Sequence, residues 1–103
     1  QTLAPAHSYM SIAPMQVPEP DTNICDVIIL CRKWIYEQFL LGIEPTDVLK
    51  SVHHSCNQSG YFDAHKIAHI FADNNVHMLK STKPIYHIEH ALYQTFTTAR
   101  FEK

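Results

Sequence analysis

The residues with the most chemical potential in this sequence are the histidines and the cysteine of one short segment, HHSCNQSGYFDAHKIAH, at positions 53–69. His65 and His69 are four residues apart, so on a helix their side chains would share one face, a spacing found in many metal sites. A zinc ion held in this way would also help a small core to fold. The candidate ligands of this structural zinc site are Cys56, His65, His69 and either His53 or His54.

Other features of the sequence argue against catalysis. The chain has no Cys-x-x-Cys pair, and Lys66 follows His65 where a His-Glu-x-x-His hydrolase has its glutamate. There is no Gly-x-Ser-x-Gly motif, and two glycines are too few for a phosphate-binding loop. We therefore expect no enzymatic activity and no cofactor, with zinc as the alternative. A further alternative is pH-dependent association, because the unperturbed pKa of histidine is about 6.5.

Aromatic side chains are the second group of candidates, because they make up 11% of the chain. That is more than one narrow core seam would use, so we expect some of them to line an apolar groove or a dimer surface. Affinity at such a surface would come from a few aromatic anchors rather than from charge. The candidate partner-binding residues are Trp34, Tyr36, Phe39, Tyr86, Tyr93 and Phe96.

The composition limits what the partner can be. The 103 residues carry a net charge of −2 and contain no basic segment of the kind that phosphate backbones require, so nucleic acid is not an expected partner. The longest apolar run, residues 27–31, is far shorter than the roughly 20 residues that cross a bilayer, so a membrane is not expected either. Hydrophobic residues at 46% and charged residues at 17% are typical of one globular domain.

The three cysteines, Cys25, Cys31 and Cys56, are an odd number without the dense spacing of a disulfide scaffold. Reduced thiols in an intracellular protein, cytoplasmic or nuclear, are the simplest interpretation. A secreted helical factor is the alternative, since the chain begins with Gln1 rather than Met and carries the glycosylation sequon NQS at residues 57–59. A disulfide from Cys25 or Cys31 to Cys56 would favour that alternative.

Residues 1–20 contain four of the six prolines and one charged residue, Glu19. Prolines at that spacing exclude a helix and disfavour a central strand, which predicts an extended arm. The arm also carries apolar side chains. It therefore either leads flexibly into the domain, or serves as a short linear motif, or docks in the apolar groove, in cis or on a neighbouring copy. The candidate arm contacts are Tyr9, Met10, Ile12 and Met15.

Helical periodicity predicts the elements that position these residues. Apolar residues recur every three to four positions from about Asn23 to Leu41, with Asn23 as the N-cap and Gly42 at the end. Leu30, Leu40 and Leu41 widen the apolar stripe beyond one narrow face. This width predicts that the first helix is contacted from more than one side, as the spine of a bundle.

Three shorter helices are expected to follow. The second begins near Pro45 and stops at residues 57–60, and the third has Asp63 as its cap and Asn74-Asn75 as its exit. The last helix opens at Pro84. No segment alternates with a period of two. The sequence therefore predicts an all-α protein, in which residues 21–103 form a small four-helix bundle behind the N-terminal arm.

We interpret the chain as a non-enzymatic helical protein–protein interaction domain of a larger regulatory or scaffold protein. It is expected to bind a partner peptide or helix, or to self-associate, through an apolar aromatic groove. A small zinc-stabilised recognition domain and a secreted helical factor are the alternatives.

Overall fold

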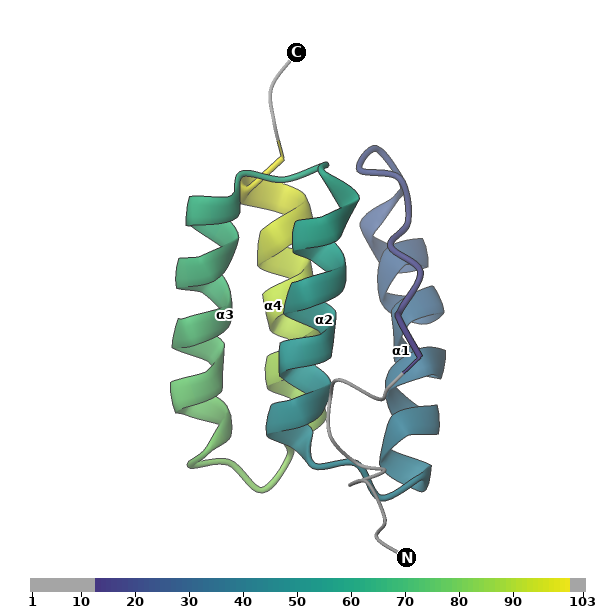
Figure 1. The fold of residues 1–103 in the computed structure, drawn as a ribbon, viewed down its shortest axis with the longest axis vertical. Coiled ribbons are helices and arrows are strands. Elements are labelled where there is room, and N and C mark those ends of the chain that lie inside the picture. The colour runs from purple at the N-terminus through teal and green to yellow at the C-terminus, as the bar shows by residue number, and fades with distance from the viewer. Residues whose placement is uncertain (1–12, 101–103) are drawn as a thin grey trace, which may run out of the picture.

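The computed structural model describes residues 13–100, which form four helices and no strand. The helices are α1 (Ile24–Leu40), α2 (Pro45–Ser59), α3 (Ala64–Met78) and α4 (Pro84–Thr98). Consecutive helices run antiparallel, side by side, and are joined by short connections (Figure 1). The predicted all-α four-helix bundle is confirmed.

Two helices begin at side chains that cap them. The Asn23 carbonyl oxygen Oδ1 accepts a hydrogen bond from the Cys25 backbone N–H at 2.8 Å at the start of α1. The Asp63 carboxylate accepts from the backbone N–H groups of His65, at 2.9 Å, and Lys66, at 3.2 Å, at the start of α3. These caps satisfy donors that have no partner inside the helix, which explains why both helices start where the sequence predicts.

Proline and glycine set other boundaries. Pro45 and Pro84 lie in the first turns of α2 and α4, where the missing proline N–H leaves no helical bond unmade. Gly60 ends α2 with a φ of 75°, a backbone conformation that favours glycine. An antiparallel bridge between Phe62 and Arg100 then ties the loop before α3 to the end of α4.

The predicted end of α3 is wrong by about one turn. The helix continues through Asn74 and Asn75 to Met78. Asn74 is buried, and its side-chain Nδ2 donates to the Ile70 carbonyl at 2.8 Å and to Gln94 Oε1 on α4 at 2.9 Å. Because these bonds satisfy the side chain while it stays within the helix, Asn74 does not end α3.

The core fills the space between the helices. α1 and α3 each pack against both α2 and α4, and α2 also contacts α4 (Figure 1). Every helix contributes fully buried side chains, so the core is shared by the whole bundle. These core residues include Val27, Cys31, Ile35, Val48, Val52, Cys56, Ile67, Ile88 and Leu92.

The described part of the arm, residues 13–20, packs against the bundle beside α1 (Figure 1). Met15 is its anchor, because this side chain is only 5% exposed and belongs to the core. The Trp34 indole Nε1 on α1 donates a hydrogen bond to the Ala13 carbonyl at 3.2 Å. The other candidate arm contacts, Tyr9, Met10 and Ile12, lie outside the described residues.

α1 is contacted from more than one side, by α2, by α4 and by the described arm, but the leucines that widen its apolar stripe are not covered. Its inner side packs on α2 and α4, but its outer side is left open. Leu30 is 60% exposed, Leu40 87% and Leu41 63%, and Ile29 is 63% exposed beside them. The apolar stripe therefore has a core-facing half and a half that no described part of the chain covers. Within residues 13–100, neither α1 nor any other helix is long and apolar enough to cross a membrane.

Candidate interaction surface

An ion pair joins α1 to α4 at the surface of the bundle. Arg32 Nε donates to Glu89 Oε2 at 2.6 Å, and Arg32 Nη2 donates to Glu89 Oε1 at 3.1 Å. This paired geometry between a guanidinium and a carboxylate orients both side chains. The Arg32 side chain is 47% exposed and that of Glu89 is 14% exposed, so the pair marks the outer edge of the α1–α4 boundary.

The three predicted partner-binding tyrosines lie along this boundary. Tyr36 follows Arg32 by four residues, while Tyr86 precedes Glu89 by three and Tyr93 follows it by four. Each tyrosine therefore shares a helix face with its charged neighbour. The three are 49%, 61% and 48% exposed, respectively. We call Tyr36, Tyr86 and Tyr93, together with the ion pair, the tyrosine seam.

The other three predicted aromatic residues are engaged inside the domain. Trp34 is half-buried and bonded to the arm, and Phe39 packs partly against the core. Phe96 is buried, with its ring centroid 5.0 Å from that of Phe62 in an edge-to-face contact. Phe96 is therefore not a surface contact for a partner, because it lies on the core face of α4.

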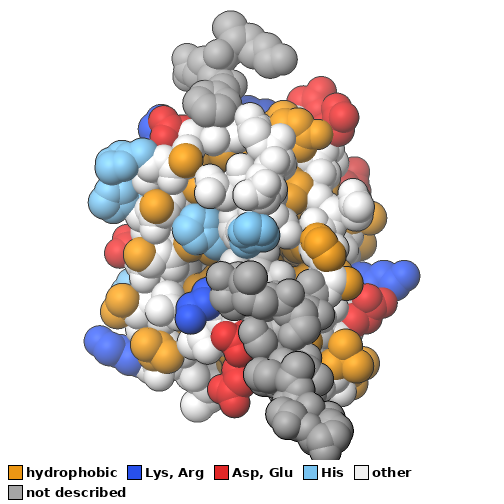
Figure 2. All heavy atoms as spheres, in the orientation of Figure 1, with side chains coloured by type: hydrophobic (Ala, Val, Ile, Leu, Met, Phe, Trp, Pro, Cys, Tyr) orange, Lys and Arg blue, Asp and Glu red, His pale blue; other side chains and the backbone are white. Residues whose placement is uncertain are grey.

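Four exposed large aliphatic side chains, three on α1 and the fourth at its C-cap Leu41, form a second surface. We call this surface the outer face of α1, and its members are Ile29, Leu30, Lys33, Glu37, Leu40 and Leu41. Figure 2 shows hydrophobic side chains along the edge of the molecule where α1 lies, with basic and acidic side chains between them. The sequence-based prediction missed this surface because it assigned the apolar residues to contacts within the bundle. The sequence does contain a pattern that indicates this surface. Two apolar pairs, residues 29–30 and 40–41, flank the opposite charges of Lys33 and Glu37 at regular spacing.

The candidate zinc ligands do not come together. Cys56 is fully buried on the core side of α2, whereas His65 and His69 are exposed on α3 with ring centroids 4.8 Å apart. The His53 ring stacks on Phe71 at 4.8 Å. Nowhere in residues 13–100 do three His, Cys, Asp or Glu side chains gather as a metal site. The two histidines share a helix face as predicted, but that face is exposed, whereas helical spacing places Cys56 on the buried face of α2.

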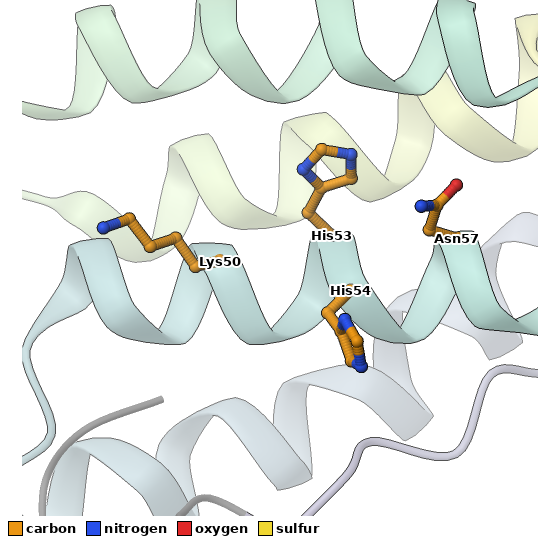
Figure 3. A pocket seen from close by; sticks show the side chains of 4 residues that line it. All are labelled: Lys50, His53, His54 and Asn57. Atoms are coloured by element: carbon orange, nitrogen blue, oxygen red, sulfur yellow. The ribbon is translucent and has the colours of Figure 1, made fainter. Parts of the chain in front are cut away.

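A shallow depression of about 210 Å³ lies over α2 and is lined by Lys50, His53, His54 and Asn57. Figure 3 shows His53 directed toward α3 and His54 toward α1, so the two imidazoles point apart. Burial, and to a smaller degree the neighbouring charge of His54, lowers the pKa of His53. All four lining residues come from one helix, so the depression offers no facing group for acid–base catalysis.

A groove of about 380 Å³ lies between the arm and the end of α2. Met15 and Val17 line it from the arm, and Ser55 and Tyr61 line it from α2 and the loop that follows. The Ser55 hydroxyl is buried and has no hydrogen-bond partner among the described residues. Residues 14–17 of the arm therefore form one wall of this groove, and α2 with the loop after it forms the other.

Two of the three thiols are buried in the core. Burial raises the pKa of Cys31 to about 12, with a smaller contribution from Glu89, and raises the pKa of Cys56 to about 12, with a smaller contribution from Cys31. Cys25 is exposed, and all three cysteines are free. Because the thiolate is the reactive form, the two buried thiols are poorly suited to nucleophilic chemistry.

No protein-family model, curated protein or solved structure matches this chain. The geometry of its surfaces is therefore the remaining guide to function. The tyrosine seam and the outer face of α1 combine apolar character with exposure.

Proposed function

We propose that this chain is a non-enzymatic helical interaction domain of a larger regulatory or scaffold protein. In this proposal, an amphipathic helix of a partner protein binds along the tyrosine seam. The observation that carries the proposal is the alignment of Tyr36, Tyr86 and Tyr93, all about half exposed, around one ion pair. Exposed tyrosines offer a large apolar contact and a hydroxyl that can hydrogen-bond, a combination enriched at protein interfaces.

The spacing of the seam suits a helical ligand. Tyr86 and Tyr93 are seven residues apart, or about 10 Å along α4 at 1.5 Å per residue. A partner helix lying along the boundary repeats its own apolar side chains over the same distance, at positions i and i+7. Arg32 and Glu89 satisfy each other, so the partner needs apolar anchors rather than charge at this point.

Two observations support a binding function over catalysis. The imidazoles of His53 and His54 point apart, and the buried thiols have raised pKa values. The free, buried Cys31 and Cys56 also support an intracellular location, cytoplasmic or nuclear, where thiols stay reduced.

Selection from a displayed library of natural peptides tests this proposal, with the purified 103-residue chain as bait. Selected peptides should carry apolar residues at i, i+3 or i+4 and i+7. The triple variant Tyr36→Ala/Tyr86→Ala/Tyr93→Ala should weaken their binding by about 30-fold or more, because one aromatic anchor is commonly worth about 2 kcal/mol.

The matched control is the double variant Val76→Ala/Leu79→Ala, which removes exposed apolar side chains from α3 and the connection after it. Peptide binding to this variant should equal that of the unmodified chain. Failure to select any helical peptide, or equal loss of binding in the tyrosine and control variants, would refute the proposed site.

A further inference from the structure

On the outer face of α1, apolar and charged positions follow the same order whether the helix is read forwards or backwards. An apolar pair, Ile29-Leu30, precedes Lys33, and a second apolar pair, Leu40-Leu41, follows Glu37. Residue 35 is the midpoint of three pairs: Ile29 and Leu41, Leu30 and Leu40, and Lys33 and Glu37. Turning α1 end over end about this point therefore superimposes apolar on apolar and basic on acidic positions.

These side chains occupy one continuous arc. At 3.6 residues per turn, the six members of the outer face span an arc of about 120° that points away from the core residue Ile35. The four apolar members are between 60% and 87% exposed, and Lys33 and Glu37 are exposed between them. An exposed apolar stripe of this kind commonly marks an interaction site.

We propose that the outer face of α1 binds the outer face of α1 in a second copy of this chain, as an antiparallel, two-fold symmetric pair. Lys33 of each copy faces Glu37 of the other copy, so two ion pairs form at the centre. Ile29 and Leu30 of each copy pack against Leu41 and Leu40 of the other. The two-fold axis crosses the interface at the level of residue 35, which itself lies on the opposite, core-facing side of α1. This inference goes beyond the proposed function, because it concerns a different surface and names a second copy of the chain as the partner of α1.

Charge complementarity favours a second copy of the chain as the partner, and it favours the antiparallel orientation. A parallel pair in register would set Lys33 against Lys33 and Glu37 against Glu37, which repel, whereas the antiparallel pair sets each against its opposite. Within residues 13–100, neither side chain is held in an ion pair, so both are available. A two-fold interface needs a surface that complements itself, and the reversed pattern of α1 meets that condition.

The length of α1 predicts a weak dimer. Its 17 residues extend over about 25 Å. One pair of exposed helix faces of this length buries less surface than the roughly 1,200 Å² at which stable interfaces begin, so we expect a dissociation constant of micromolar order. Such an interface allows exchange between copies on mixing.

Sedimentation equilibrium of the full 103-residue chain tests the pairing, over concentrations from about 1 µM to 1 mM that bracket a micromolar constant. The single variants Lys33→Glu and Glu37→Lys should each raise the dissociation constant at least about tenfold, because each sets like charges against one another twice. An equimolar mixture of the two variants should restore the dimer, since acidic outer faces then meet basic ones. Lys66→Glu, an exposed charge reversal on α3, should leave association unchanged.

A chain that stays monomeric at every concentration, or a mixture of Lys33→Glu and Glu37→Lys that stays monomeric, would overturn the inference. So would a dimer that Lys66→Glu weakens as much as the α1 variants do. Circular dichroism melts of each variant establish that it is folded, because intrahelical repulsion in these variants costs only a few tenths of a kcal/mol. Peptide binding at the tyrosine seam is measured separately, so a failed dimer leaves that test intact.

Discussion

At the scale of single residues, burial separates the three cysteines. Cys25 is exposed on α1, whereas the pKa of Cys31 and that of Cys56 are raised to about 12 by burial. We expect one thiol of the native chain to react readily with a thiol reagent at pH 8 and all three to react in denaturant. Cys25→Ser should abolish the fast reaction, and rapid modification of two or three native thiols would contradict the described core.

His53 makes stability depend on pH. Because burial lowers its pKa in the folded chain, the unfolded chain binds more protons just below the unperturbed pKa of about 6.5. Its contribution to stability is therefore present above about pH 6.5 and is lost as the pH falls through the lower, folded-state value.

The prediction for His53 is measured by urea unfolding at pH 7.5 and pH 5. His53→Gln should lose less stability between these values than the unmodified chain, since glutamine does not titrate. Asn57→Ala, which lines the same depression and adds no titratable group, is the control and should keep the full pH dependence. An equal pH dependence in the unmodified chain and His53→Gln would argue against this account.

At the scale of elements, Asn74 connects α3 to α4. Its side-chain Nδ2 donates to Gln94 Oε1 and to the Ile70 carbonyl, and its Oδ1 lies 3.2 Å from His90 Nδ1. Asn74→Ala leaves these polar groups without their partner, so it should lower the free energy of unfolding by about 2 kcal/mol. Asn75→Ala on the half-buried neighbouring position should cost less than about 0.5 kcal/mol. Equal costs in chemical denaturation would show that the network does not stabilise the bundle.

The same element shows which parts of the fold the sequence could predict. Helix starts depend on local chemistry, so Asn23, Asp63 and the two prolines predicted them well. The end of α3 depends on a hydrogen bond to a residue twenty positions away, and no local pattern contains that information. Periodicity likewise identified the apolar stripe of α1 but not how much of it other helices would cover.

The candidate sites follow the same division. Exposed tyrosines could be proposed from their amphipathic character, and three of them do lie on the surface. Phe96 is buried because it packs against Phe62. Whether Cys56 meets His65 and His69 depends on how α2 and α3 are packed, which residue type and spacing do not determine.

At the scale of the whole molecule, residues 13–20 of the arm are part of the folded unit. Met15 belongs to the core, and Arg100 Nη1 beyond α4 donates to the Pro20 carbonyl at 2.9 Å. Met15→Ala should therefore lower the free energy of unfolding by at least about 2 kcal/mol, as for other buried methionines. Gln16→Ala, at the exposed neighbouring position, should be nearly neutral in the same denaturation experiment. A neutral Met15→Ala would mean that the arm does not dock in solution.

The most direct test of the outer face of α1 as a binding surface is a filtered nuclear Overhauser experiment on a mixture of ¹³C-labelled and unlabelled chains, at about 1 mM, well above a micromolar dissociation constant. We expect contacts between copies from the methyl groups of Ile29 and Leu30 to those of Leu41 and Leu40. Contacts between copies that involve only other surfaces, such as Val76 and Leu79, would contradict it, and so would the absence of any contact between copies.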